Sequence, residues 1–193
     1  CAPPTWRVAG GWGLVGRGVG QFESPQAIAL DTTLNHVIVT DVDNFRVQVF
    51  DTTGIMQFKF GYRIMYLPTS EVAWFARSEG VAVDSCSNIY ISDALMGTIR
   101  VFDSLGRELD PAHAPSVGYG TDPGDLRVPC DVTIDAGRLY VASTNNGAIE
   151  VYDVLCTNGG VAGDVDGDGD VDLFDFASFP SCTLGCSSIC MNM

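Results

Sequence analysis

Six aspartates lie close together in the segment GDVDGDGDVDLFDF, residues 163–176. Their spacing fits a twelve-position calcium loop, which places oxygen ligands at positions 1, 3, 5, 7, 9 and 12 and a glycine at position 6 for a sharp turn. Gly169 falls at position 6, and the apolar Val171 falls at position 8. The predicted Ca²⁺ ligands are Asp164, Asp166, Asp168, Asp172 and Asp175 through their side chains and Asp170 through its backbone carbonyl.

A solvated acidic linker is the alternative interpretation of this segment. Carboxylates held so close together repel one another unless a cation neutralises them, which favours the calcium loop. Loops of this kind in extracellular modules bind Ca²⁺ with dissociation constants of about 10⁻⁴–10⁻³ M. Calcium is therefore the predicted cofactor.

The second group of reactive side chains is the cysteines. None of them forms the paired CxxC pattern of a zinc ribbon or a thioredoxin-like site, so disulfides in an oxidising compartment are predicted. The last three are spaced by four residues and could instead hold a soft metal, although a fourth ligand is not apparent. An odd number leaves at least one cysteine for another chain, a free thiol or a lipid. The disulfide candidates are Cys1, Cys86, Cys130, Cys156, Cys182, Cys186 and Cys190.

Side chains suited to catalysis are few. The two histidines, His36 and His113, have no repeated companion that would build a histidine-ligated metal site, and each is interpreted as a surface or packing residue. No G-x-S-x-G elbow is present. The glycine-rich residues 10–20 lack the G-K-[ST] ending of a phosphate loop and are interpreted as a flexible connection. The sequence therefore predicts no catalytic residue and a chain that is not an enzyme.

Charge and hydropathy restrict the partners. The chain has 10 basic and 24 acidic residues, a net charge of −14, which argues against nucleic acid and against an anionic membrane surface. No apolar run approaches the roughly 18 residues that cross a bilayer. The sequence starts at Cys1 rather than at methionine, which suggests a processed secretory precursor. We expect an extracellular or cell-surface protein, with lipidation of Cys1 as an open alternative.

The elements that must position these residues are strands of a repeat. A first strand recurs as QAIALD, GVAVDS and CDVTID at residues 26–31, 80–85 and 130–135. A second recurs as HVIVTD, NIYISD and RLYVAS at residues 36–41, 88–93 and 138–143, and a third as FRVQVFD, TIRVFD and AIEVYD at residues 45–51, 98–103 and 148–153. A fourth strand, IMQFKFG, follows the first unit at residues 55–61, and a less clear one lies around RELDPAHA in the second. Three short β-rich runs per unit predict a meander of antiparallel strands.

This repeat resembles the NHL repeat, most closely in residues 18–61. The resemblance implies an all-β fold of three four-stranded β-propeller blades, forming an incomplete ring over residues 1–157. A small calcium-loop and short-helix appendage would follow at residues 158–193. An unrelated β-sandwich is the alternative fold.

Three blades are too few to close a propeller ring, because the wedge-shaped sheets number four to eight in closed rings. The segment TWRVAGG, residues 5–11, resembles a spare closing strand in which Gly10 corresponds to Gly61, whereas the third unit has no fourth strand. A neighbouring copy could supply that strand, producing a closed ring or an open filament. A disulfide between Cys1 of one chain and Cys156 of the next could then secure it, and Cys86 could bridge to Cys130 between adjacent blades.

The acidic segment resembles one half of a type I dockerin, a module that normally carries two such loops. We therefore expect a non-enzymatic extracellular assembly protein that associates with copies of itself by strand complementation and is stabilised by Ca²⁺ and disulfides. The alternative is a secreted binding module that presents its loops to a carbohydrate or protein partner and is anchored by the dockerin-like tail.

Overall fold

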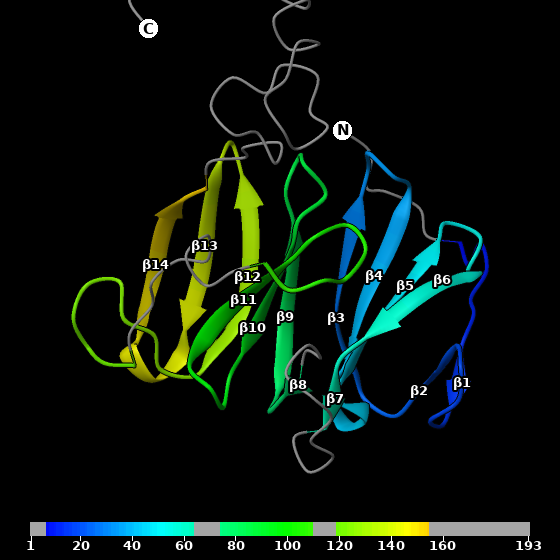
Figure 1. Ribbon diagram of the computed structural model, residues 1–193, viewed down its shortest axis with the longest axis horizontal. Helices are drawn as coiled ribbons and strands as arrows, with labels where there is room; N and C mark the ends of the chain where they lie inside the picture. The colour runs from blue at the N-terminus through cyan, green and yellow to red at the C-terminus, as the bar shows by residue number, and fades with distance from the viewer. Residues whose placement is uncertain (1–6, 64–73, 110–118, 155–193) are drawn as a thin grey trace, which may run out of the picture. The chain divides into compact units, whose positions relative to one another are not determined.

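The structure of the chain, a computed structural model, describes residues 7–63, 74–109 and 119–154 (Figure 1). The chain separates into two units, residues 1–155 and 156–193, and every described residue belongs to the first. The described part consists of strands and two short 3₁₀ helices, η1 (Val42–Asn44) and η2 (Thr144–Asn146). The predicted all-β class is confirmed for this part of the chain.

Sheet 1 is an antiparallel meander whose four strands neighbour one another in sequence order. It contains β3 (Pro25–Asp31), β4 (His36–Asp41), β5 (Arg46–Asp51) and β6 (Met56–Phe60). The central strands β4 and β5 are rich in valine, isoleucine and phenylalanine and are buried along most of their length, as expected for strands covered on both faces. The predicted fourth strand of the first unit is confirmed as β6.

Sheets 2 and 3 repeat the first three strands of sheet 1. Sheet 2 contains β9 (Ser78–Val83), β10 (Ile89–Asp93) and β11 (Thr98–Phe102). Sheet 3 contains β12 (Pro129–Asp135), β13 (Arg138–Ser143) and β14 (Ala148–Asp153). In the described part of the second unit, the less clear fourth strand is reduced to one antiparallel bridge between Phe102 and Glu108.

Two short parallel ladders precede sheets 1 and 2. The first joins β1 (Leu14–Val15) to β2 (Gln21–Phe22), and the second joins β7 (Tyr62–Arg63) to β8 (Trp74–Phe75). Each ladder ends in a phenylalanine three residues before the first strand of its sheet. The ladders therefore mark equivalent entry points into the two sheets.

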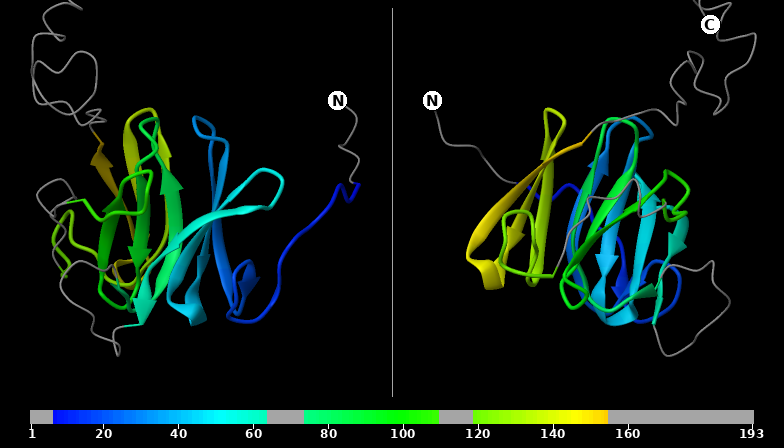
Figure 2. Two further views of the ribbon diagram at one scale, coloured as in Figure 1. Left: turned by 45° about the vertical axis from the view of Figure 1, so that its right-hand side comes forward. Right: turned by 60° about the vertical axis from the view of Figure 1, so that its left-hand side comes forward.

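The three sheets stand side by side, with β9 in contact with both β3 and β12 (Figures 1 and 2). The approach of β9 to β12 is close, because a Cβ atom added at Gly80 would lie 2.7 Å from the Cα atom of Asp131. Only glycine fits at this position without movement of the neighbouring backbone. The first strands of the repeat are thus the innermost strands of the array.

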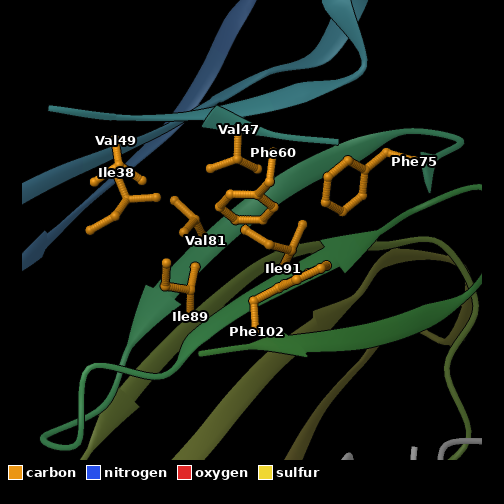
Figure 3. Close-up of a cluster of buried hydrophobic side chains, with 9 residues drawn as sticks. All are labelled: Ile38, Val47, Val49, Phe60, Phe75, Val81, Ile89, Ile91 and Phe102. Atoms are coloured by element: carbon orange, nitrogen blue, oxygen red, sulfur yellow. The ribbon is translucent and has the colours of Figure 1, made fainter. Parts of the chain in front are cut away.

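Two apolar cores hold the sheets together. The core between sheets 1 and 2 is shown in Figure 3, with Val47, Val49 and Phe60 of sheet 1 facing Val81 and Phe102 of sheet 2. Three aromatic rings form its centre: Phe60 and Phe102 lie 4.7 Å apart, and Phe75 lies 5.7 Å from Phe102. The core between sheets 2 and 3 contains Ala82, Tyr90, Ile99, Val101, Leu126, Val132, Leu139 and Val141. Sheet 2 is consequently covered on both faces.

Candidate functional site

The N-terminal segment has the local geometry of a chain that leaves a fourth strand. Gly13 has φ +95°, and a Cβ atom added there would lie 2.8 Å from the ring of Phe22. Gly61, which follows the fourth strand of sheet 1, has φ +98°, and its added Cβ atom would lie 2.5 Å from the ring of Phe75. Both positions require glycine for the same two reasons, the left-handed backbone and the adjacent ring. Gly13 is therefore the structural equivalent of Gly61.

The residues on either side of Gly13 support this equivalence. The ladder strand that follows Gly13 is β1, and the one that follows Gly61 is β7. Trp12 packs on Phe50 at 6.2 Å, as Phe60 packs on Phe102 at 4.7 Å. The predicted correspondence of Gly10 with Gly61 is therefore wrong by three residues, because it was based on a glycine in the sequence and not on the backbone conformation that requires one.

With this register, residues 8–12 correspond to β6. In the structure residues 7–13 belong to no strand, and all of them are exposed. Val8 is 90% exposed, an unusual state for a β-branched apolar residue. The part of the spare strand at residues 5 and 6 lies outside the described residues. The described part is an unpaired segment that begins at the entry to sheet 1.

The connection after this segment is held by buried polar groups. The guanidinium of Arg46 donates hydrogen bonds to the carbonyls of Arg17, Gly18 and Gln21, and its Nε lies 3.0 Å from Asp41. The side chain of Asn44 donates to the carbonyl of Gly16. The glycine-rich connection predicted to be flexible is thus tied to sheet 1 through residues 16–21.

At the other end of the array, β14 is an edge strand in the part of the chain that the structure describes. It pairs with β13 along one side, and sheet 3 has no counterpart of β6 there. The side chains of β14 alternate between half-buried and exposed, and Ile149 and Val151 are on the exposed face. An unpaired edge of this kind presents a row of backbone N–H and C=O groups to any incoming strand.

Aspartates at the ends of the second strands fix the chain ahead of each sheet. Asp41 accepts hydrogen bonds from the backbone N–H groups of Glu23 and Ser24, and Asp93 accepts from those of Ala76 and Arg77. Both carboxylates are fully buried. Ser143 replaces them in sheet 3 and accepts from the N–H of Arg127 through its hydroxyl. The sequence shows these residues as a repeated strand end, but their anchoring role depends on contacts over about 16 to 18 residues.

Other aspartates of the repeat close turns. Asp51 accepts hydrogen bonds from the backbone N–H groups of Thr53 and Ile55, and Asp103 accepts from those of Leu105 and Arg107. The Thr53 hydroxyl, and then the backbone N–H of Ile55, lower the pKa of Asp51. These two carboxylates therefore stabilise the turns that follow the third strands of sheets 1 and 2.

Two tyrosines, the buried Tyr90 and the half-buried Tyr152, have raised pKa values. Burial, together with the charge of Asp84 and a hydrogen bond to it, raises the pKa of Tyr90 well above its usual range. Burial and the charges of Glu150 and Asp125 raise the pKa of Tyr152 to about 12. The Tyr152 hydroxyl donates to the carbonyl of Gly124 at 2.7 Å. These hydroxyls are protonated at neutral pH and act as hydrogen-bond donors.

A groove of about 720 Å³ runs along the inner strands β3, β9 and β12. It is lined by residues 26–30, 79, 81–83 and 130–134, including the side chains of Gln26, Glu79 and Asp131. No group of three or more histidine, cysteine, aspartate or glutamate residues suited to a metal occurs within residues 7–63, 74–109 and 119–154. The groove is therefore a candidate binding surface with no metal centre among its described residues.

The predicted site residues fall mainly outside this region. The calcium ligands Asp164, Asp166, Asp168, Asp170, Asp172 and Asp175 lie outside the described residues, as do Cys1, Cys156, Cys182, Cys186, Cys190 and His113. His36 begins β4, half-buried, with its ring 6.3 Å from that of Phe58 in an edge-on contact. It therefore makes a packing contact with the fourth strand of its own sheet.

The predicted disulfide between Cys86 and Cys130 is wrong. Cys130 carries a free thiol, which accepts a hydrogen bond from Thr144, whereas Cys86 is disulfide-bonded. Cys130 directly precedes Asp131, whose backbone lies beside Gly80 in the middle of β9. Cys86 lies in the turn beyond the far end of β9, so about 10 Å of extended chain already separates the two positions at about 3.3 Å per residue. Bridged cysteines have Cα atoms within about 7 Å.

Comparison with protein families identifies the repeat. Residues 22–50 match the NHL repeat. The matched stretch begins at the end of β2 and contains β3, β4 and nearly all of β5, the strands for which the sequence predicted this resemblance. The NHL resemblance is confirmed for these residues, and the dockerin-like tail stays a prediction. Curated proteins give no match to the chain.

Solved structures resemble the fold that contains this NHL repeat. A protein of unknown function from Bacteroides thetaiotaomicron matches with a TM-score of 0.52 and 19% identity, over 65% of this chain and 34% of its own. Hydrazine synthase from Kuenenia stuttgartiensis matches with a TM-score of 0.49 and 16% identity, over 67% and 32%. The chain thus spans about a third of the length of these structures. With the NHL repeat, the likeness to the Bacteroides protein supports a β-propeller-type fold.

The prediction that the chain is not an enzyme is corrected by the same comparisons. A gluconolactonase from Xanthomonas campestris matches with a TM-score of 0.44 and 17% identity, over 64% of this chain and 36% of its own, and a luciferin-regenerating enzyme matches at 14% identity. Enzymes are thus among the proteins similar to this chain. Because one fold hosts many activities, the small number of histidines does not exclude catalysis.

No helix in the described ranges is long and apolar enough to cross a membrane.

Proposed function

We propose that the chain is an extracellular assembly protein whose copies join through strand complementation. The N-terminal segment at residues 8–12 of one copy adds to the free edge of β14 in the next and becomes the fourth strand of its sheet 3. The observation that carries the proposal is the equivalence of Gly13 and Gly61. Because Gly61 directly follows the fourth strand of sheet 1, residues 8–12 correspond to a fourth strand, although they are exposed and belong to no sheet.

The pairing of β5 with β6 supplies the register of the proposed contact. Val47 pairs with Phe60, and Val49 pairs with Phe58. In the equivalent arrangement Ile149 of one copy pairs with Trp12 of the next, and Val151 pairs with Gly10. Backbone hydrogen bonds along the edge provide the affinity, as in other cases of strand addition. Copies joined in this way form a closed ring or an open filament, depending on whether the rotation closes.

Calcium and disulfides would stabilise the assembly. The predicted ligands Asp164 to Asp175 would order the tail around Ca²⁺, which is abundant outside cells. A bridge between Cys1 of one chain and Cys156 of the next would prevent the added strand from leaving. Removing Ca²⁺ with a chelator and reducing the protein are therefore expected to weaken association separately.

A peptide of residues 5–13 added in trans tests the proposal. It should compete for the edge of β14 and lower the mass of the assembled protein in sedimentation velocity. The matched control is the same peptide with proline at the positions of Val8 and Gly10, because proline cannot donate the ladder hydrogen bonds. If both peptides act equally, or neither does at saturating concentration, strand complementation is wrong.

A binding module is the second candidate function, favoured by the groove along the inner strands. A volume of about 720 Å³ is within the usual size of a site for a small molecule or a short saccharide. Exchange of amide protons along β3, β9 and β12 upon addition of candidate saccharides would detect such binding. Protection at these strands in the dispersed single chain would favour this function over assembly.

A further inference from the structure

The outward faces of sheets 1 and 3 each repeat one half of the interface that joins neighbouring sheets inside the chain. The head face is the outward face of sheet 1, formed by Phe22, Ile28, Leu30, Val37, Val39 and Phe50. The tail face is the outward face of sheet 3, formed by Thr133, Tyr140, Ala142, Ile149 and Val151. Each face is compared below with the equivalent positions of sheet 2, where both faces are covered.

The head face repeats the side of sheet 2 that packs on sheet 1. Cross-strand pairing places Leu30 opposite Val37 and Val37 opposite Phe50, as it places Val83 opposite Ile89 and Ile89 opposite Phe102. In sheet 2 all of these residues belong to the core shared with sheet 1. On the head face the position of Val81, 5% exposed, is occupied by Ile28, 64% exposed.

The tail face repeats the side of sheet 2 that packs on sheet 3. Ile149 and Val151 of β14 are equivalent to Ile99 and Val101 of β11, which are 2% and 3% exposed. In β14 the same positions are 64% and 50% exposed. Tyr140, paired with Val151, is the equivalent of the buried Tyr90. The polar Thr133 and Asp131 stand on the inner strand, where sheet 2 has Ala82 and Gly80.

Part of the head face is already covered by the segment that enters sheet 1. Phe22 lies 5.7 Å from Phe50, and Trp12 packs on the same ring. These contacts leave the inner strand open, with Ile28 and Leu30 exposed. The uncovered part of the head face is therefore on the inner strand β3, which corresponds to the strand β9 through which sheet 2 contacts sheet 1.

From this correspondence we infer that the head face of one copy packs on the tail face of another, continuing the interfaces between sheets 1 and 2 and between sheets 2 and 3. The inference rests on the proposed function, because strand addition to β14 brings the two faces together. Inside the chain β9 contacts β3 and β12, so β3 of one copy meets the polar inner strand β12 of the other and forms the wetter side, while the apolar row on β14 forms the centre of the contact. The partner is a second copy, since each face matches the one that it would meet inside the chain.

Single substitutions on the two faces test the inference in the full chain with Ca²⁺ present. Ile28→Asp disables the head face, and Ile149→Asp disables the tail face. Each should raise the concentration at which half of the chains are associated by about tenfold or more, because a carboxylate would be buried in an apolar contact. Leu105→Asp is the matched control: Leu105 is also 64% exposed but lies on the turn after β11. It should leave association unchanged.

Mixing the two variants gives the sharper result. A head-disabled copy retains its tail face, and a tail-disabled copy retains its head face, so an equal mixture should form a dimer with one intact contact while each variant alone stays dispersed. Circular dichroism checks that both variants are folded, which is expected because both side chains are exposed in the single chain. Association of either variant at the wild-type concentration, or failure of the mixture to pair, overturns the inference.

Deleting residues 1–11 separates this inference from strand complementation. If the deletion disperses the protein and the face variants do not, strand addition is correct and face packing is wrong. If the face variants disperse it and the deletion does not, face packing is correct and strand addition is wrong. Dispersal by both supports the combined contact, and a wild-type chain that stays at 20.6 kDa contradicts both.

Discussion

Sheet 2 and the outward faces of sheets 1 and 3 have the same repeated apolar residues in different surroundings. In sheet 2 these side chains lie in the cores on both faces, and Val81 and Ile99 are 5% and 2% exposed. At the ends of the array, Ile28 and Ile149 occupy equivalent positions and are exposed. The comparison teaches that the repeat specifies a face for packing, whereas neighbouring sheets determine whether that face is covered.

The largest effect is expected at the centre of the interior interface. Phe102→Ala removes a fully buried ring that packs on Phe60 and Phe75, and should lower the free energy of unfolding by about 3–5 kcal/mol. Chemical denaturation of the dispersed chain measures this. Tyr152→Ala is the comparison. Tyr152 occupies the position in sheet 3 that Phe102 occupies in sheet 2 but is only half-buried, so this substitution should lower the free energy of unfolding by less. Equal losses would mean that interior and end positions do not differ in packing.

The buried anchors should have the next largest effect. Asp93→Ala leaves the backbone N–H groups of Ala76 and Arg77 without their acceptor and should cost about 2–3 kcal/mol of unfolding free energy. Asp93→Ser should cost less, about 1 kcal/mol, because a hydroxyl can accept one of these hydrogen bonds, as that of Ser143 does in sheet 3. Denaturation curves in which the serine variant is less stable than the alanine variant would contradict the role of Asp93 as a hydrogen-bond acceptor.

A matched pair of valines compares the interior and the tail face directly. Val49→Ala should lower the unfolding free energy by about 2 kcal/mol, because this fully buried side chain loses two methyl groups from a packed core. Val151→Ala, at the equivalent position on the tail face, should change it by less than about 0.5 kcal/mol in the dispersed chain. At concentrations where copies associate, the Val151 variant should instead show weaker association.

The smallest effect is confined to alkaline pH. Burial and the neighbouring Asp84 raise the pKa of Tyr90 above its value in the unfolded chain, so the folded chain retains a proton that the unfolded chain loses. Stability from this group is therefore complete below the ordinary tyrosine pKa of about 10 and decreases as the pH rises above it. Thermal unfolding from pH 8 to 11 should show this decrease, and Tyr90→Phe should reduce it. Tyr140→Phe, on the tail face, is the control and should preserve the decrease.

The strands were predictable because each repeat shows its periodicity locally. Residues 36–41 and 45–51 became β4 and β5 nearly as the pattern indicated. The correspondence of Gly13 with Gly61 was not predictable. The neighbouring glycines Gly10 and Gly11 match the glycine after the fourth strand equally well when only the sequence is known. Only the positive φ and the nearby phenylalanine ring distinguish Gly13.

Long-range geometry explains the other differences between prediction and structure. The Cys86–Cys130 bridge was expected from adjacent sheets, but the direction of β9 carries Cys86 away from Cys130. The sequence shows Asp41 and Asp93 as a repeated residue at the ends of the second strands. Their role as acceptors was not predictable, because the backbone N–H groups that donate to them are over a dozen residues away. In contrast, the exposure of Ile149 depends on the absence of a covering sheet in the described chain, which no local pattern indicates.

Sedimentation equilibrium of the full chain with Ca²⁺ tests the central claim, that copies join through their ends, most directly. The measured mass should rise above 20.6 kDa as the protein concentration increases. An equal mixture of the Ile28→Asp and Ile149→Asp variants should reach the mass of a dimer and stop there. A constant mass of one chain for the wild-type protein across the whole concentration range would contradict the account.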